Sequence, residues 1–167
     1  MRLHIVRIAA LCALAALFPA AAIADTRPIT ARDLWELDRI GSLSLSPDGR
    51  WAAIVVTDYD VAKNEGQGDI WLVAVDGSGI RRFTTGPTTE GSPAWSPDGS
   101  MLAFTAKREG EKAQLHVIPL DGGEARAVTD MPLGASNPHW LPGGRRIAFV
   151  SSVLPGFEAD LDSMRAE

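Results

Sequence analysis

Two aspartates recur in the same four-residue setting, where a carboxylate could bind a metal ion or act as an acid. Asp48 lies in Ser-Pro-Asp-Gly at residues 46–49, and Asp98 lies in the same four residues at 96–99. Proline fixes φ at the second position of a type I turn, and the glycine after the aspartate adopts a positive φ without steric cost. We therefore interpret both aspartates as turn residues that join antiparallel strands.

Histidine is another side chain that could bind a metal ion. His116 and His139 are isolated, because neither has an acidic or cysteine partner at a spacing suited to metal binding. The sequence thus predicts no metal site and no cofactor. A Gly-x-Ser-x-Gly motif is also missing from the printed residues, so no catalytic residue is assigned.

Four tryptophans lie in strand-like segments and could stack on a ligand. Trp95 and Trp140 occupy equivalent places in two repeats, and Trp51 and Trp71 lie in other strands. Repetition at one position of a repeat favours packing between sheets over sugar binding.

Charged segments offer the remaining candidates, and the substrate-binding residues stay unassigned. The acidic stretch at residues 57–69, TDYDVAKNEGQGD, is interpreted as a solvated loop, with contact to the amino terminus of a substrate as the alternative. Arg81-Arg82 and Arg145-Arg146 lie beside strands. There they favour protection of a sheet edge, with a carboxylate clamp as the alternative.

The turns belong to a longer repeat that must position all these residues. A third, degenerate turn reads Leu-Pro-Gly-Gly at 141–144, and each turn lies between strand-like segments such as WAAIVV, MLAFTA and RIAFVS. After the hairpin come a loop, another strand and Asp-Gly, at 76–77 and again at 121–122. Four short strands in a repeat of about 40–50 residues are typical of a β-propeller blade.

The predicted fold is therefore all-β: a partial propeller of four-stranded antiparallel blades at residues 43–167. The blades are expected at about 43–86, 90–130 and 135–167, the last one truncated, which gives about two and a half blades. Residues 25–42 should form a segment with a short helix, TARDLWELDRI, whose apolar face includes Leu34, Leu37 and Ile40. We expect the chain to be the first part of a longer protein.

The first 24 residues have the pattern of a secretory signal peptide. Arg2 and Arg7 precede an apolar core too short to span a membrane, and Ala22-Ile23-Ala24 offers small residues for cleavage after Ala24. The only cysteine, Cys12, lies inside this segment. The pattern predicts a periplasmic or secreted protein that has no membrane segment once the signal is removed.

Charge excludes one class of partner. Without the signal segment the chain has 14 basic and 21 acidic residues, a net charge of −7, and no basic stripe with interleaved aromatic residues. Binding to nucleic acid is therefore not expected.

Several segments resemble a known family over nearly the whole mature chain. ITARDLWELDRIGSLSLSPDGRWAAIVVT resembles the start of the propeller in bacterial prolyl oligopeptidase-family serine peptidases of the dipeptidyl- and acylaminoacyl-peptidase type. SPAWSPDGSMLAFTAKREGEKAQLHVIPLDGGEARAVTD and PLGASNPHWLPGGRRIAFVSSVLPG continue the resemblance. The Ser-Pro-Asp-Gly hairpin also occurs in TolB-like and WD40-like propellers. The helix and the segment after IAFVSSVLPG favour the peptidases.

The resemblance implies that the propeller gates and docks peptide substrates for a C-terminal α/β-hydrolase domain that carries the Ser-Asp-His triad. By this interpretation the chain belongs to a parent serine peptidase but catalyses nothing by itself. The alternative is a TolB-like periplasmic propeller that serves as a protein-binding scaffold. A third possibility is a propeller that is itself an enzyme, such as a lyase with its site on the central channel.

Overall fold

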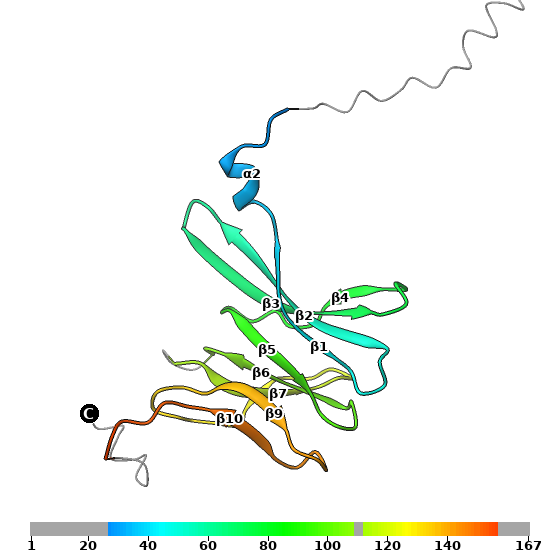
Figure 1. Ribbon diagram of the computed structural model, residues 1–167, viewed down its shortest axis with the longest axis vertical. Helices are drawn as coiled ribbons and strands as arrows, with labels where there is room; N and C mark the ends of the chain where they lie inside the picture. Colours follow the sequence, from blue (N-terminus) through cyan, green and yellow to red (C-terminus); the bar gives the residue numbers. More distant parts are fainter. Residues whose placement is uncertain (1–26, 109–111, 157–167) are drawn as a thin grey trace, which may run out of the picture. The chain divides into compact units, whose positions relative to one another are not determined.

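Antiparallel strands make up almost all of the regular structure, as two four-stranded sheets and a two-stranded hairpin (Figure 1). The computed structural model describes residues 27–108 and 112–156. The predicted signal peptide and the closing residues 157–167 lie outside that range. The chain divides into two units, residues 1–30 and 31–167, and the sheets belong to the second.

The first sheet, blade 1, follows chain order. It contains β1 (Arg39–Leu45), β2 (Trp51–Asp60), β3 (Glu65–Ala74) and β4 (Ile80–Arg82) in the order β1-β2-β3-β4. Strands β2 and β3 form a long hairpin that pairs from Trp51 opposite Ala74 to Asp60 opposite Glu65.

The second sheet, blade 2, repeats this plan. It contains β5 (Glu90–Trp95), β6 (Met101–Ala106), β7 (Gln114–Pro119) and β8 (Arg126–Ala127) in the order β5-β6-β7-β8. A third unit begins with β9 (Ser136–Trp140) paired to β10 (Ile147–Val150). The prediction of four-stranded antiparallel blades is confirmed for blades 1 and 2. The first strand begins at Arg39 rather than near residue 43.

The repeated turns have the predicted geometry. Gly49, Gly99 and Gly144 have φ values of +70°, +71° and +67°. The amide N of Gly49 donates to the carbonyl O of Ser46 at 2.9 Å, and the other two glycines make the same bond to the first residue of their turns. The third turn keeps this geometry without the serine and aspartate, because the backbone bond and the glycine are enough to close it.

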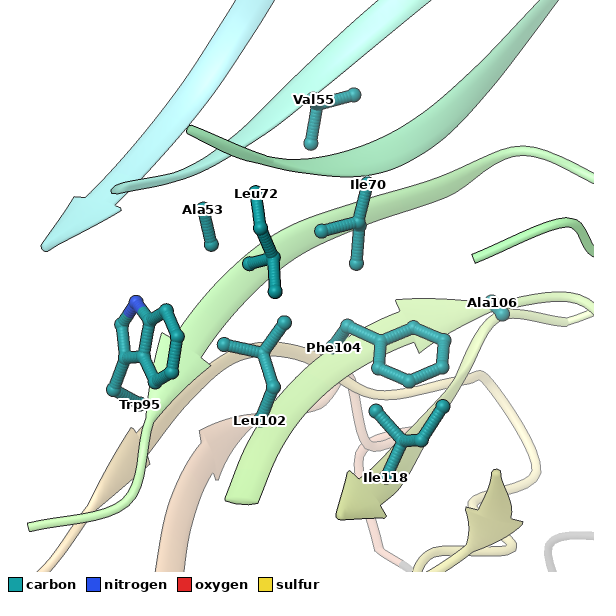
Figure 2. Close-up of a cluster of buried hydrophobic side chains, with 9 residues drawn as sticks. All are labelled: Ala53, Val55, Ile70, Leu72, Trp95, Leu102, Phe104, Ala106 and Ile118. Carbon is teal, nitrogen blue, oxygen red and sulfur yellow. The ribbon is translucent and has the colours of Figure 1, made fainter. Parts of the chain in front are cut away.

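The main core lies between blades 1 and 2 (Figure 2). Blade 1 contributes side chains from β2 and β3. Blade 2 contributes side chains from β5, β6 and β7, most of which are larger. The buried residues are Ala53, Val55, Ile70, Leu72, Trp95, Leu102, Phe104, Ala106 and Ile118. Residues two apart along each strand point the same way, so the alternation in sequence selects the face that enters this core.

The helix before blade 1 is shorter than the sequence predicts. Helix α2 spans Ala31–Trp35, and none of its residues is buried. Leu34 and Leu37 are exposed, and Ile40 belongs to strand β1, so these three side chains do not share one helical face. The strand pairing of β1 with β2 competes with the helix and ends it early. Among the described residues, no helix is long and apolar enough to cross a lipid bilayer.

Candidate functional site

The tip of the β2–β3 hairpin, the connection from β4 to β5 and the end of β6 meet at one end of the blades, here called the loop end. Gln67 Nε2 donates to the carbonyl O of Gly86 at 2.8 Å, and Thr89 Oγ1 donates to the carbonyl O of Gly66 at 3.2 Å. These bonds fix the acidic hairpin of blade 1 against the connection that enters blade 2.

An open groove of about 500 Å³ lies between these segments. The hairpin side is lined by Asp58, Lys63, Glu65 and Gln67, and the other side is formed by residues 87–89. Asp60 also lines the groove, so four of its lining residues are charged and three of those are acidic. Carboxylates and backbone groups of this kind can bind the polar ends of a peptide.

The hairpin is held in its conformation by its own side chains. Asp60 Oδ1 accepts hydrogen bonds from the amides of Ala62 and Lys63 at 3.0 and 3.1 Å, and Lys63 Nζ lies 2.9 Å from Asp60 Oδ2. The side-chain bond from Lys63 is the main cause that lowers the pKa of Asp60. Both oxygens of Asp60 are therefore bound within the turn. Asp58 and Glu65 are the groove carboxylates that remain available to a ligand.

An aromatic cage supports the hairpin from the side of helix α2. The guanidinium of Arg39 lies 4.2 Å from the ring centroid of Tyr59 and 5.1 Å from that of Trp35, and the two rings meet edge to face at 5.8 Å. A side chain at Gly66 would place its Cβ 2.8 Å from Tyr59 Cε1, so only glycine fits under the ring. Sequence reasoning missed this cage. The sequence analysis placed Tyr59 and Gly66 in a solvated loop, whereas the structure pairs them across strands β2 and β3.

A buried ion pair lies under the loop end. Glu90, at the start of β5, is fully buried and pairs with Arg108, whose side chain is 24% exposed. Within the described residues, Glu90 Oε2 and Arg108 Nε have no hydrogen-bond partner. The sequence analysis did not single out either residue, because the two are far apart in the chain and belong to no motif.

The two turn aspartates act as we expected. Ser46 Oγ donates to Asp48 Oδ1 at 2.6 Å, and Ser96 Oγ donates to Asp98 Oδ1 at 2.5 Å. These serine bonds are the largest cause of the low pKa of both carboxyls, which falls to about 2 for Asp98. The two carboxylates therefore accept hydrogen bonds from within their own turns, which stabilises the turns.

The tryptophans separate into two groups. Trp95 is buried, and its Nε1 donates to the carbonyl O of Ser44 at 3.0 Å, while Trp140 Nε1 donates to the carbonyl O of Ala94 at 3.0 Å. Packing between sheets, as predicted from the repeat, is confirmed for Trp95 and Trp140. Trp51 packs against the edge of the same core, whereas Trp71 is half-buried on the opposite face of blade 1.

Neither histidine lies in a cluster of ligands. His116 is buried and stacks on Phe104, with a centroid distance of 5.7 Å, and its Nδ1 lies 3.2 Å from the carbonyl O of Gln114. His139 is exposed in β9. No group of three or more His, Cys, Asp or Glu residues in the described part of the chain could hold a metal ion.

The paired arginines lie in different settings. Arg81 and Arg82 lie on β4, the edge strand of blade 1, where Arg81 covers Phe83 and Arg82 pairs with Asp69 at 2.6 Å. Arg145 and Arg146 lie in the turn before β10 rather than on an edge strand. The structure does not gather these arginines at the loop end.

Residues 39–163 match the family described as the TolB β-propeller domain, PD40. The chain belongs to this family. The match covers the two blades, the third unit and the connections that carry the loop end.

Curated relatives of this PD40 chain are peptidases. The chain is 35% identical over 101 residues to dipeptidyl-peptidase 5 of Porphyromonas gingivalis, an alignment that covers 60% of this chain and 15% of the relative. It is 37% identical over 90 residues to the uncharacterized peptidase YuxL of Bacillus subtilis, with 54% and 14% covered. The aligned part is therefore a small fraction of each relative.

Solved structures share the fold. The AtxE2 isopeptidase superimposes with a TM-score of 0.59 at 24% identity, covering 70% of this chain and 22% of that one. The β-propeller domain of the Trilobed protease from Pyrococcus furiosus gives a TM-score of 0.56 at 19% identity, covering 70% and 34%. At these identities the likeness shows the fold alone.

Proposed function

We propose that residues 25–167 form part of the propeller of an exported serine peptidase of the prolyl oligopeptidase type. In this proposal the propeller docks peptides and controls their access to an α/β-hydrolase domain elsewhere in the protein. The observation that carries it is the sequence identity of 35–37% to a part of each of two peptidases. The signal peptide at residues 1–24, cleaved after Ala24, and the periplasmic or secreted location are part of the same proposal.

The loop end is the proposed docking surface. Its groove presents Asp58 and Glu65 beside the polar connection at residues 87–89, and the cage around Arg39 holds the hairpin in place. A charged, open groove of this kind suits the backbone and the charged end of a short peptide. A folded protein could not insert its backbone there.

Helix α2 is the proposed contact with the catalytic domain. Leu34, Trp35 and Leu37 are 53%, 47% and 59% exposed, and Trp35 is held by Arg39 next to the loop end. Adjacent exposed apolar side chains are typical of an interaction surface. A domain that packs on α2 would stand over the groove.

The experiment compares the isolated chain with the longest natural protein that contains it. The isolated residues 25–167 should hydrolyse neither aminoacyl nor dipeptidyl chromogenic substrates and should take no fluorophosphonate label. The natural protein should cleave short peptides and lose this activity on labelling. Labelling of the isolated chain would place a nucleophile within it and refute the assignment.

A TolB-like scaffold is the second candidate, because the family that matches residues 39–163 is named for TolB. TolB from Acinetobacter baumannii also shares the fold, with a TM-score of 0.50 at 19% identity, covering 64% of this chain and 25% of that one. A natural protein that takes no fluorophosphonate label and cleaves no peptide would favour this scaffold over the peptidase.

A further inference from the structure

Blade 1 has an uncovered apolar face, here called the back face, on the side away from blade 2. Strand pairing places Leu43, Ile54 and Trp71 in one row across this face, and Leu45, Ala52, Val73 and Ile80 in the next. Leu43, Leu45 and Ile80 are about 60% exposed, with values of 61%, 58% and 62%. Exposed aliphatic side chains in adjoining rows indicate a surface that another element covers.

The internal repeat identifies the kind of element. Counted from the shared turns, Leu45, Ile54 and Val73 of blade 1 correspond to Trp95, Phe104 and Ile118 of blade 2. These three residues of blade 2 are the ones that pack on blade 1 in the main core. The back face of blade 1 is therefore the face by which a blade of this repeat packs on another sheet.

The hydrogen bond that a tryptophan makes to the preceding blade cannot form at this face. Trp95 donates its indole N–H to Ser44 O of the preceding blade, and Trp140 donates to Ala94 O in the same way. Leu45 takes the place of Trp95 in blade 1 and has no donor. A sheet that covers the back face cannot receive this bond.

The back face instead offers an acceptor. Asp69, 7% exposed, uses Oδ2 to pair with Arg82 Nη2 at 2.6 Å, while its buried Oδ1 has no partner among the described residues. Gln114, the corresponding residue of blade 2, is satisfied within its own blade by Thr129 Oγ1 and the amide of Met131 at 2.8 and 2.9 Å. At this position of the repeat, the unpaired acceptor is thus found in blade 1 and not in blade 2.

Asp69 belongs to a cavity of about 270 Å³ at the end of the back face nearer the loop end, here called the acidic cradle. Asp38 and Asp58 line it with Asp69, and Trp71 provides an aromatic wall. Arg82 is the one basic residue among its lining residues, against three acids. A buried carboxylate oxygen without a partner is costly, and a cation with N–H donors would satisfy it.

Blades of a propeller are arranged radially, so a further blade is expected at the back face of blade 1. We propose that this blade inserts a lysine or arginine side chain into the acidic cradle. Aliphatic side chains of that sheet cover Leu45 and Val73. In the same way, Ala53 and Leu72 of blade 1 cover the facing side chains of blade 2 in the main core. The alkyl stem of the basic residue lies along Trp71, and its charged end reaches the carboxylates. At this contact the donor comes from the partner sheet.

This chemistry would also give the contact its specificity. The blade faces of this chain join through apolar side chains, so apolar packing by itself does not distinguish one blade from another. A sheet with a basic residue placed opposite Asp58 and Asp69 would be favoured at this face. A sheet without one would be disfavoured, because it would bury a carboxylate without a partner. The inference does not depend on whether the natural protein is a peptidase.

Photo-crosslinking identifies the sheet. Ile80→Cys is introduced into the natural protein that contains this chain, labelled with a benzophenone maleimide and irradiated. Peptide mass spectrometry should find a cross-link to a strand of the same polypeptide, outside residues 31–156, in a blade that carries lysine or arginine. Cross-links to a second copy, to another protein or to no polypeptide would overturn the proposal. Ser78→Cys, in the exposed β3–β4 turn, is the matched position that should give no such product.

Charge exchange tests the salt bridge itself. Asp58→Lys should lower the melting temperature of the natural protein, and so should replacement of the cross-linked basic residue by aspartate. The two together should restore most of the loss. Asp58 is used because Asp69 also holds Arg82. Asp121→Lys, an exposed residue of blade 2, is the control that should give additive effects. Additive effects with Asp58→Lys would overturn the proposal.

Discussion

The indole nitrogen of Trp95 lies 3.0 Å from the carbonyl oxygen of Ser44, and this hydrogen bond joins the first strands of two consecutive blades. The ring is buried in the core between the blades. Trp95→Phe keeps most of the apolar contact and removes the donor, which leaves Ser44 O without its partner. We expect a loss of about 1–3 kcal/mol in the free energy of unfolding, measured by urea denaturation.

Trp71→Phe is the matched control for this change. Trp71 lies on β3 of blade 1, on the face turned away from the main core, and is half-buried. Replacing Trp71 should lower the free energy of unfolding less than replacing Trp95. Equal losses for the two variants would show that the inter-blade hydrogen bond is not what makes Trp95 important.

The turn glycines should tolerate no side chain without loss. Gly99 has a φ of +71°, a region that alanine adopts only with strain, so Gly99→Ala should destabilise the protein by roughly 1 kcal/mol or more. Gly49→Ala, at φ +70°, should behave alike. Gly79 is the control, because it has no positive φ and a Cβ there meets nothing within 4 Å. If Gly79→Ala cost as much as Gly99→Ala, strain in the turn would not be the cause.

Much of this fold could be predicted because the conformation of the turn is determined by a short local sequence. Proline and glycine fix the backbone within four residues, and alternation in the adjoining strands chooses the buried face. The third turn shows how little is needed, since Gly144 keeps its φ of +67° after the serine and aspartate are gone. Helix α2 was overestimated for the opposite reason. Ile40 satisfies a helical pattern in sequence, but its pairing with Val56 places it in a strand.

The low pKa of Asp98 should appear as a change of stability with pH. The pKa of about 2 in the folded protein lies below the ordinary value near 4, so ionised Asp98 stabilises the fold above pH 4. This contribution should disappear as the pH falls from about 4 to 2. The difference in stability between the natural chain and Asp98→Asn should therefore shrink over that interval, measured by thermal melting.

Ser96 tests the cause of that shift. Its hydroxyl donates to Asp98 and is the largest contributor to the low pKa. Ser96→Ala should move the pKa of Asp98 upward, measured by carbon NMR of the carboxyl group. If the pKa stayed at about 2 in Ser96→Ala, the backbone amide of Ser100 would have to be the main cause.

The buried pair of Glu90 and Arg108 should be among the most sensitive positions of blade 2. Glu90→Gln leaves a largely buried guanidinium without its counter-charge, which costs about 3 kcal/mol for pairs of this kind. Chemical denaturation measures the loss. Glu36→Gln removes one partner of the exposed Arg32–Glu36 pair and should have little effect. Equal effects would mean that burial does not set the importance of the Glu90 pair.

The candidate site was harder to predict than the fold, because its contacts cross between segments. The acidic stretch was recognised from its composition, but the roles of its members come from geometry. Asp60 is bound within its own turn by Lys63, while Asp58 lines both the groove and the acidic cradle. The cage of Arg39, Trp35 and Tyr59 needs the β1–β2 register and the helix end together. No single window of sequence contains that information.

Tyr59 links the site to the proposed function. Tyr59→Ala removes a wall of the cage under Arg39 and the ring that covers Gly66, so the hairpin that lines the groove should lose its fixed position. In the natural protein this should change kcat/KM more for longer peptides than for a dipeptide substrate. The rate of fluorophosphonate labelling should stay the same, because the hairpin takes no part in the chemistry. Val61→Ala, at the exposed tip of the same hairpin, is the control. If the labelling rate fell together with kcat/KM in Tyr59→Ala, the hairpin would act on the catalytic domain itself, and its assignment as a docking surface would be wrong.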